Sequence, residues 1–195
     1  MKVKICGITS VYDATLCEEM GADAVGFVHY PGRRRSLALD EIARIASSLG
    51  PMTTKVIVCA PGDAQEAIDL SERGGVDVIQ TYSLDPEALD NVRGSGLKVI
   101  RAVSIERADA EAFAPHADAL VFEQGIPGTG ASYDYSGVPV DCCDRAIIAG
   151  GLTVDNVGEA KALKPYAVDV SSGVESANGR KDPELVTEFI RRAKR

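Results

Sequence analysis

Eight short apolar segments recur along the chain of 195 residues, and segments with helical periodicity lie between most of them. The expected strands cover residues 2–6, 24–28, 55–59, 76–80, 98–102, 119–122, 146–149 and 168–171. Alternation of strands and helices at this pace, without a linker or a change in composition, is typical of a parallel α/β fold. Eight strands favour a closed (βα)8 TIM barrel over an open, doubly wound sheet, so we expect one compact domain that spans residues 1–195.

The chain is short for such a barrel, which typically has roughly 250 residues, so we expect short loops. The stretch between Glu123 and Arg145 is the exception. Gly, Pro, Asp and Tyr are dense there, and only a poor sixth helix can be drawn. Irregular segments of this size are more often functional than idle.

Residues that favour the first turn of a helix follow several of the expected strands. Ser10 and Thr153 can accept hydrogen bonds from the first backbone N–H groups of a helix, as N-cap residues do. Asp85-Pro86 and Asp182-Pro183 combine a capping side chain with a proline, which suits the first helical position. We therefore expect helices to begin at these places.

The acidic composition restricts the classes of partner. The formal net charge is −8, which argues against nucleic acid and requires local positive groups for any anionic ligand. Five cysteines without a CxxC pair indicate a reducing compartment, and only two histidines argue against a histidine metal site. We recognise no membrane span and no signal peptide at Met1, so we expect a cytoplasmic protein without a metal ion or cofactor.

In a TIM barrel the chemistry lies at the carboxyl ends of the strands. The residues that this sequence presents there are Cys6, Arg33, Arg34, Arg35, Gln80, Glu123, Gly150, Gly151, Asp169, Ser171, Ser172 and Gly173. Alternation along the strands also places Lys4 on the side of Cys6. Because the first and last strands of a closed barrel are neighbours, we expect Lys4 and Asp169 to pair inside it.

Two consecutive strand-to-helix turns are rich in glycine and serine. Gly150-Gly151 follows the seventh expected strand, and Ser171-Ser172-Gly173 follows the eighth. Such turns leave backbone N–H groups facing a ligand, and the seventh and eighth turns of TIM barrels commonly bind phosphate in this way. Either turn alone would favour a purely structural role, but the pair, one βα unit apart, favours a phosphate site.

Three further candidates have both a structural and a functional interpretation. Cys6 is either a small buried hydrophobe or a reactive thiol at a strand end before Gly7. The run Arg33–Arg35 is either a solvated patch or the source of an arginine for a carboxylate or phosphate. Glu123 follows an apolar strand directly, and is either half of a structural ion pair or a general acid.

Several motifs spread from one end of the chain to the other carry a family resemblance. They are Lys4-Ile-Cys-Gly-Ile-Thr9, Gly21-Ala-Asp-Ala-Val-Gly-Phe27, Pro127-Gly-Thr-Gly130 with Tyr133-Asp-Tyr135, Ala149-Gly-Gly-Leu152 with Asn156-Val157, and Val168-Asp-Val-Ser-Ser-Gly-Val-Glu175 with Gly179 and Lys181-Asp182. Together they resemble the motifs of phosphoribosylanthranilate isomerase, a family of tryptophan biosynthesis. The first and last motifs are specific to this family in combination.

The resemblance implies a (βα)8 barrel that converts N-(5-phosphoribosyl)anthranilate to 1-(2-carboxyphenylamino)-1-deoxyribulose 5-phosphate in an Amadori rearrangement. The family's general base matches Cys6, its general acid stands at the position of Glu123, and its arginine for the anthranilate carboxylate matches Arg35. Its phosphate-binding turns match Gly150, Gly151, Ser172 and Gly173, and we also expect Asp169 and Gln80 to contact the substrate. The implied partner is a small phosphoribosyl compound, bound by a monomer or homodimer.

The sequence departs from the family pattern in two places. Glu123 stands where the family usually has aspartate, and a displacement near 1 Å can cost roughly a hundredfold in rate. Gln80-Thr-Tyr-Ser83 replaces the usual Gln-Leu-His-Gly, which affects how substrate packs on this side. A non-catalytic barrel that binds a phosphosugar therefore stays an alternative. Another phosphoribosyl isomerase or synthase is a second one, although those of the histidine branch typically use two aspartates and the first strand here ends in Cys6.

Overall fold

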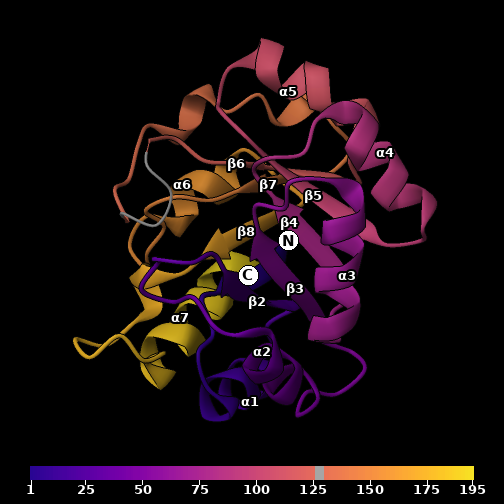
Figure 1. Ribbon diagram of the computed structural model, residues 1–195. Coiled ribbons are helices and arrows are strands. Elements are labelled where there is room, and N and C mark those ends of the chain that lie inside the picture. Colours follow the sequence, from indigo (N-terminus) through magenta and orange to yellow (C-terminus); the bar gives the residue numbers. More distant parts are fainter. Residues whose placement is uncertain (126–129) are drawn as a thin grey trace.

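The structure is a computed structural model that describes residues 1–125 and 130–195 (Figure 1). Within these residues, eight parallel strands form a closed barrel in which each strand pairs with the next and β8 pairs with β1. The strands are β1 Lys2–Cys6, β2 Ala24–His29, β3 Thr54–Cys59, β4 Val78–Thr81, β5 Lys98–Val103, β6 Ala119–Phe122, β7 Ala146–Ile148 and β8 Ala167–Val170. The (βα)8 barrel expected from the sequence is confirmed.

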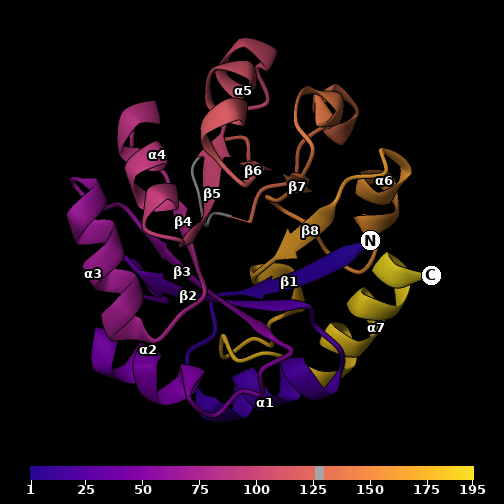
Figure 2. The same cartoon turned by 90° about the vertical axis from the view of Figure 1, so that its right-hand side faces the viewer.

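Helices form an outer ring around the strands, as Figure 2 shows. They are α1 Val11–Glu19, α2 Leu39–Ala46, α3 Ala64–Gly74, α4 Pro86–Gly94, α5 Arg107–Phe113, α6 Val157–Ala162 and α7 Pro183–Lys194. Between β6 and β7 the described residues form only short 3-10 helices, Tyr135–Gly137 and Val140–Cys142, so this connection lacks a regular α-helix there, as expected. Residues 127–129 of the motif in this connection lie outside the described residues. No helix in the described ranges combines the length and apolar character needed to cross a membrane.

Three of the expected helix starts are confirmed. Oγ of Ser10 accepts a hydrogen bond from the N–H of Asp13 at 3.1 Å, and Oδ1 of Asp85 accepts one from the N–H of Ala88 at 2.9 Å. The carboxylate of Asp182 likewise accepts from two N–H groups in the first turn of α7. These side chains satisfy backbone donors that have no partner within the helix.

The expectation that Thr153 caps a helix is wrong. Helix α6 begins at Val157 with Asn156 at the N-cap position, and Thr153 belongs to the turn before it. Oγ1 of Thr153 accepts from the N–H of Asp155, and Oδ1 of Asn156 accepts from the N–H of Thr153. Nδ2 of Asn156 also donates to the carbonyl of Gly151, so the two side chains stabilise the turn instead of the helix.

Strand β4 begins two residues later than expected because Val76 completes the end of α3. Gly75 adopts the left-handed conformation that commonly ends a helix, with φ +60°. The N–H of Val76 then donates to the carbonyl of Ser71, and the Val76 side chain is buried. This apolar residue therefore belongs to the helix end, which a sequence pattern cannot separate from a strand start.

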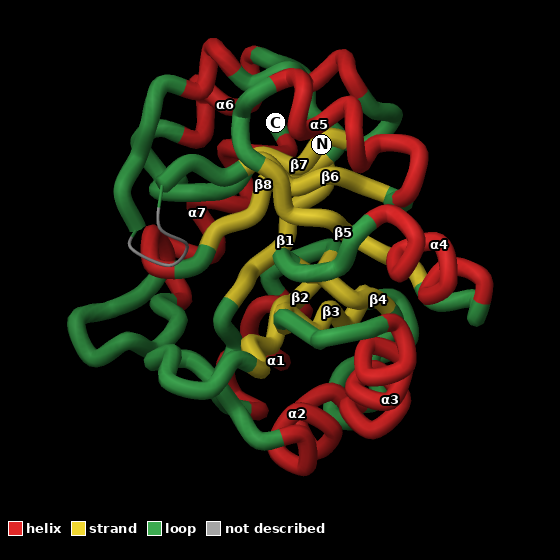
Figure 3. The backbone as a smooth tube through the Cα atoms, turned by 45° about the horizontal axis from the view of Figure 1, so that its top comes forward, coloured by secondary structure: helices red, strands yellow, loops and turns green. Residues whose placement is uncertain are grey.

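The apolar core has two parts. The larger part lies between the strands and the helices and includes Val3 and Ile5 of β1. A smaller group fills the inside of the barrel, and consists of Ala102, Ala119, Val121, Ile147, Ala149 and Ala167. Figure 3 shows the longer irregular connections, in green, mainly on the left of the molecule.

Candidate active site

A pocket of about 530 Å³ opens at the carboxyl ends of the strands. Its lining includes Cys6, Arg33, Arg34, Arg35, Gln80, Glu123, Gly150, Gly151, Asp169, Ser171 and Ser172, all of which the sequence placed at strand ends. Gly173 is the exception, because it is absent from the lining. A Cβ at Gly173 would overlap with the carbonyl of Leu152, so this glycine allows two neighbouring turns to approach each other.

The expected pair between Lys4 and Asp169 is present and lies beside Cys6. Nζ of Lys4 donates to Oδ2 of Asp169 at 2.6 Å, and the two side chains are only 4% and 7% exposed. A Cβ at Gly26 of β2 would lie 2.8 Å from Sγ of Cys6 and 3.1 Å from Nζ of Lys4. The thiol and the ammonium therefore converge over the face of a glycine, which makes room for both.

The protonation of the Cys6 thiol depends on opposing influences. Burial raises its pKa, and the ammonium of Lys4 is the strongest influence in the opposite direction. Burial acts to lower the pKa of Lys4, but Asp169 and Cys6 outweigh this effect and raise that pKa overall. Lys4 is therefore a permanent cation, and a Cys6 thiolate would form next to it.

We predict that Lys4→Met raises the pKa of the Cys6 thiol further, since it removes the cation that favours the thiolate. The rate of Cys6 alkylation by iodoacetamide, followed by peptide mass spectrometry, should then rise at higher pH than in the parent. Lys2→Met is the control, because Lys2 lies on the same strand, is 58% exposed and pairs with Asp23. This control should leave the alkylation profile unchanged.

Lys4→Met leaves Asp169 without its partner, and breaking a buried pair costs roughly 3–5 kcal/mol. The double variant Lys4→Met with Asp169→Asn removes both charges and avoids this cost. Lys4 influences the thiol more strongly than Asp169 does, so the double variant should shift the profile in the same direction. Parent-like alkylation of Cys6 in both variants would show that Lys4 does not favour the thiolate.

Glu123 lies against Tyr82, which comes from the end of β4. Oη of Tyr82 donates a hydrogen bond to Oε2 of Glu123 at 3.1 Å. Burial and then the charge of Glu123 raise the pKa of Tyr82, so this residue stays a phenol and a donor. A Cβ at Gly150 would lie 3.4 Å from Cγ of Glu123, so this glycine makes room for the acid. The two departures from the family pattern, Glu123 and Tyr82, therefore contact each other.

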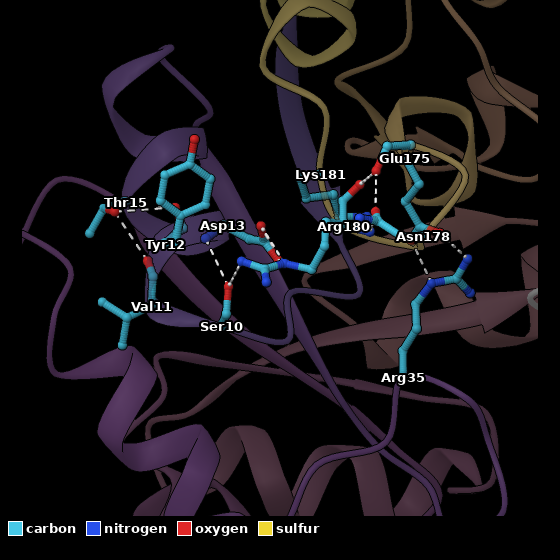
Figure 4. Close-up of polar contacts among 11 residues, drawn as sticks. Ser10, Val11, Tyr12, Asp13, Thr15, Arg35, Glu175, Asn178, Arg180 and Lys181 are labelled. Carbon is cyan, nitrogen blue, oxygen red and sulfur yellow. Dashed lines mark hydrogen bonds and ion pairs between the residues drawn. The ribbon is translucent and has the colours of Figure 1, made fainter.

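Of the three arginines that follow β2, Arg34 and Arg35 share one partner and Arg33 has another. Nε and Nη2 of Arg35 donate to the two carboxylate oxygens of Glu175, at 2.7 and 2.9 Å, as Figure 4 shows. Nη2 of Arg34 donates to Oε2 of the same carboxylate at 2.6 Å, and Arg33 lies over the ring of Tyr30. Arg35 is 13% exposed and Arg34 is 60% exposed, so Arg35 is the arginine held within the pocket.

The two glycine turns contain backbone N–H groups that have no partner among the described residues. Gly150 and Gly151 have φ values of +88° and +64°, a region that favours glycine. The carbonyl of Gly150 accepts a hydrogen bond from Oη of Tyr135 at 2.7 Å. The N–H groups of Gly150, Gly151, Ser172 and Gly173 donate no hydrogen bond to any described residue. Unpaired N–H groups in such turns are suited to binding an anion.

Two buried oxygen atoms in the pocket lining have no hydrogen-bond partner among the described residues. They are Oε1 of Gln80 and Oδ1 of Asp169. A buried acceptor without a partner is unfavourable, so a bound ligand that donates to these atoms would gain affinity. Hydroxyl groups of a sugar are donors of this kind.

Sequence reasoning assigned no role to Tyr82, Glu175 or Lys181, although each contacts a site residue. Glu175 and Lys181 belong to the last of the family motifs, and Tyr82 is one of the departures from the family pattern. The sequence therefore marked all three residues, but it did not show which residues they contact. For metal binding, the described part of the chain contains no group of three or more His, Cys, Asp or Glu side chains that could hold an ion.

Comparison with known proteins confirms the resemblance. Residues 3–192 match the family model described as N-(5'phosphoribosyl)anthranilate (PRA) isomerase. The N-(5'-phosphoribosyl)anthranilate isomerase of Geobacter sulfurreducens is 38% identical over 200 residues, which cover 100% of this chain and 98% of the relative.

Solved structures agree. The phosphoribosyl anthranilate isomerase of Thermus thermophilus is 37% identical, with a TM-score of 0.90 and coverage of 98% of each chain. A further phosphoribosyl anthranilate isomerase structure is a complex with reduced 1-(o-carboxyphenylamino)-1-deoxyribulose 5-phosphate, here called the reduced product analogue. That protein is 32% identical, with a TM-score of 0.86, and the match covers 100% of this chain and 98% of the other. Together with the barrel and the residues that line its pocket, these matches show that the chain belongs to the N-(5'-phosphoribosyl)anthranilate isomerase family of tryptophan biosynthesis.

Proposed function

We propose that the pocket at the carboxyl ends of the strands carries out the Amadori rearrangement, with Cys6 as general base and Glu123 as general acid. The observation that carries this proposal is that both side chains line one pocket together with the unpaired N–H groups of two glycine turns. A thiol, a carboxyl group and an anion site are what an acid/base isomerisation of a phosphorylated sugar requires.

The proposed reaction uses these two residues in turn. Glu123 protonates the furanose ring oxygen of N-(5-phosphoribosyl)anthranilate, and the ring opens to a Schiff base. The Cys6 thiolate then removes the proton from C2, which gives an enolamine. In the tautomerisation to the ketone, C1 gains a proton and the C2 hydroxyl loses one, so both groups can return to their starting protonation states.

The remaining residues hold the substrate. The phosphate accepts hydrogen bonds from the N–H groups of Gly150, Gly151, Ser172 and Gly173, and the lack of a Cβ at Gly173 lets its turn approach Leu152. A Cβ at Gly151 would overlap with the backbone of Ser132, so bulk at Gly151 would disturb loop packing as well as the phosphate. Substitution there therefore does not report on phosphate binding alone.

The anthranilate carboxylate and the sugar hydroxyls of the substrate bind to polar side chains. Arg35 binds the anthranilate carboxylate, which suits a planar guanidinium with several donors. Oε1 of Gln80 and Oδ1 of Asp169 accept hydrogen bonds from the sugar hydroxyls, which relieves both unpaired atoms. This arrangement fixes the sugar between the acid and the base.

Complementation tests the proposed activity directly. Expression of the protein should restore growth without tryptophan to a strain that lacks this isomerase, and the purified protein should convert N-(5-phosphoribosyl)anthranilate. An empty vector is the growth control. A protein that binds the reduced product analogue but shows no turnover and no complementation would instead be a non-catalytic phosphosugar-binding barrel.

A further inference from the structure

Glu175 is a buried carboxylate that three cations share. Its side chain is 5% exposed and pairs with Arg34, Arg35 and Lys181 at distances of 2.6 to 3.0 Å. The contact with Arg35 can be followed in Figure 4. Burial acts to raise its pKa, but Arg35, Lys181 and Arg34 outweigh burial and lower that pKa to about 2. Glu175 is therefore ionised at any pH at which an enzyme of this kind works.

The contact with Arg35 uses one edge of the guanidinium and leaves another edge available. Nε and Nη2 donate to the two oxygens of Glu175, whereas Nη1 donates to no described residue. A Cβ at Gly7 would overlap with Cδ of Arg35, so the arginine stem lies directly over this glycine. The stem of Arg35 thus packs on Gly7, and its guanidinium is held on one edge by Glu175. Arg35 also lines the pocket.

The charges around Glu175 do not cancel. One carboxylate faces three cations, so the cluster has an excess of positive charge in a protein whose formal net charge is −8. Lys181, with a side chain only 1% exposed, donates to Oε1 of Glu175 and to the carbonyl of Ser171, both at 3.0 Å. Lys181 holds the carboxylate of Glu175 in place. Because this single negative charge does not neutralise all three cations, Arg35 can still attract an anion.

The segment that carries Glu175 is itself anchored. Residues Glu175 and Lys181 form an isolated antiparallel bridge, and the N–H of Ser176 donates to the carbonyl of Arg180 at 2.9 Å. Nε of Arg180 contacts the buried carboxylate of Asp13 in α1 at 3.1 Å. Figure 4 shows Arg180 directed toward Ser10 and Asp13, away from Arg35. The segment of residues 175–181 is therefore anchored to α1 by a contact that points away from Arg35.

We propose that Glu175 is a positioning residue that orients Arg35 so that its free edge binds the carboxylate of the substrate. This inference rests on the proposed role of Arg35. It assigns selectivity for a carboxylate-bearing substrate to a residue that does not touch the substrate. Glu175→Gln removes the charge and replaces one of the two acceptor oxygens with an NH2 group, so Arg35 loses its fixed orientation.

The test compares two ligands that differ only in the carboxylate. One is reduced 1-(o-carboxyphenylamino)-1-deoxyribulose 5-phosphate, and the other is the same compound without the carboxyl group. Glu175→Gln should weaken binding of the first by about tenfold or more and change binding of the second little, since charge-assisted contacts are lost for the carboxylate alone. Calorimetry gives both affinities, and kinetics should show an increase in KM with a much smaller change in kcat.

Matched variants separate positioning from general damage. Glu188→Gln is the control, because Glu188 also pairs with two arginines but lies on α7 away from the pocket lining. Glu175→Asp keeps the negative charge in the cluster but shortens the side chain by one methylene, which withdraws its oxygens from Arg35. It should therefore show the same selective loss even if Glu175→Gln does not fold. An equal loss for both ligands in either folded variant would mean a purely structural role and would overturn the inference.

A double-mutant cycle distinguishes this inference from the proposed function. Arg35→Met should itself abolish the preference for the carboxylate ligand, and Glu175→Asp should then add little, because it acts through Arg35. If Arg35→Met leaves the preference intact, the proposed role of Arg35 fails. If Arg35→Met removes the preference but neither change at Glu175 reduces it, only the positioning role of Glu175 fails.

Discussion

Cys6→Ser should lower kcat by at least about a hundredfold, since general base catalysis contributes roughly 10²- to 10⁴-fold. Serine keeps the size and position of the side chain over Gly26, but its hydroxyl hardly ionises near neutral pH. Affinity for the reduced product analogue should therefore stay near that of the parent, because no phosphate, sugar or carboxylate contact is changed. Steady-state kinetics and calorimetry on the same preparation give the two values.

The control for this change is Cys142→Ser. Cys142 is also partly exposed but does not line the pocket, so its replacement should leave kcat unchanged. The pH profile of the parent should be bell-shaped, because one group must be ionised and the other protonated. Burial raises the pKa of Cys6, so the thiolate is the minority form at neutral pH, and the cation of Lys4 limits this disadvantage. Parent-like turnover by Cys6→Ser would remove Cys6 as the base.

Glu123→Gln should cause a loss of similar size, at least about a hundredfold in kcat. The amide keeps the length of the side chain and can still accept the hydrogen bond from Tyr82, so the geometry beside Gly150 is preserved. It has no proton that can be transferred to the ring oxygen. Binding of the reduced product analogue should again change little, which would place the loss in the chemical step.

Tyr82→Phe is the informative comparison. It removes the hydrogen bond to Glu123 but leaves the acid in place, so its effect on kcat should be clearly smaller than that of Glu123→Gln. If both variants lost the same activity, orientation of Glu123 by Tyr82 would be as important as the proton itself. If Glu123→Gln turned over substrate like the parent, another group would have to be the acid.

The order of strands and the face that carries the chemistry could be predicted from local patterns. Alternation along β1 placed Lys4 and Cys6 on one side, and barrel closure then predicted the pair between Lys4 and Asp169, which the structure confirms. Both arguments need only the period of a strand and the identity of neighbours. The glycine turns could be recognised because backbone conformations with positive φ favour glycine, which can be read directly in the sequence.

The contacts around Arg35 and Glu123 could not be predicted in this way. Arg35 and Glu175 are separated by 140 positions and meet through loops whose course no periodicity determines. Tyr82 and Glu123 come from different strand ends, and their hydrogen bond depends on the space that Gly150 leaves. Thr153 shows the same limit locally, since a turn and a helix N-terminus both use threonine as an acceptor.

The ion pair between Lys4 and Asp169 joins residues 165 positions apart, at the register where β1 meets β8. Contacts of such large sequence separation form late and slowly, because the chain must lose much of its freedom before they are made. The proposed base lies on one side of this seam, and the proposed phosphate turns lie at the end of β8 and beyond its neighbour β7. A growing chain without β8 therefore has neither a closed barrel nor a complete site, and catalysis begins only when β8 pairs with β1.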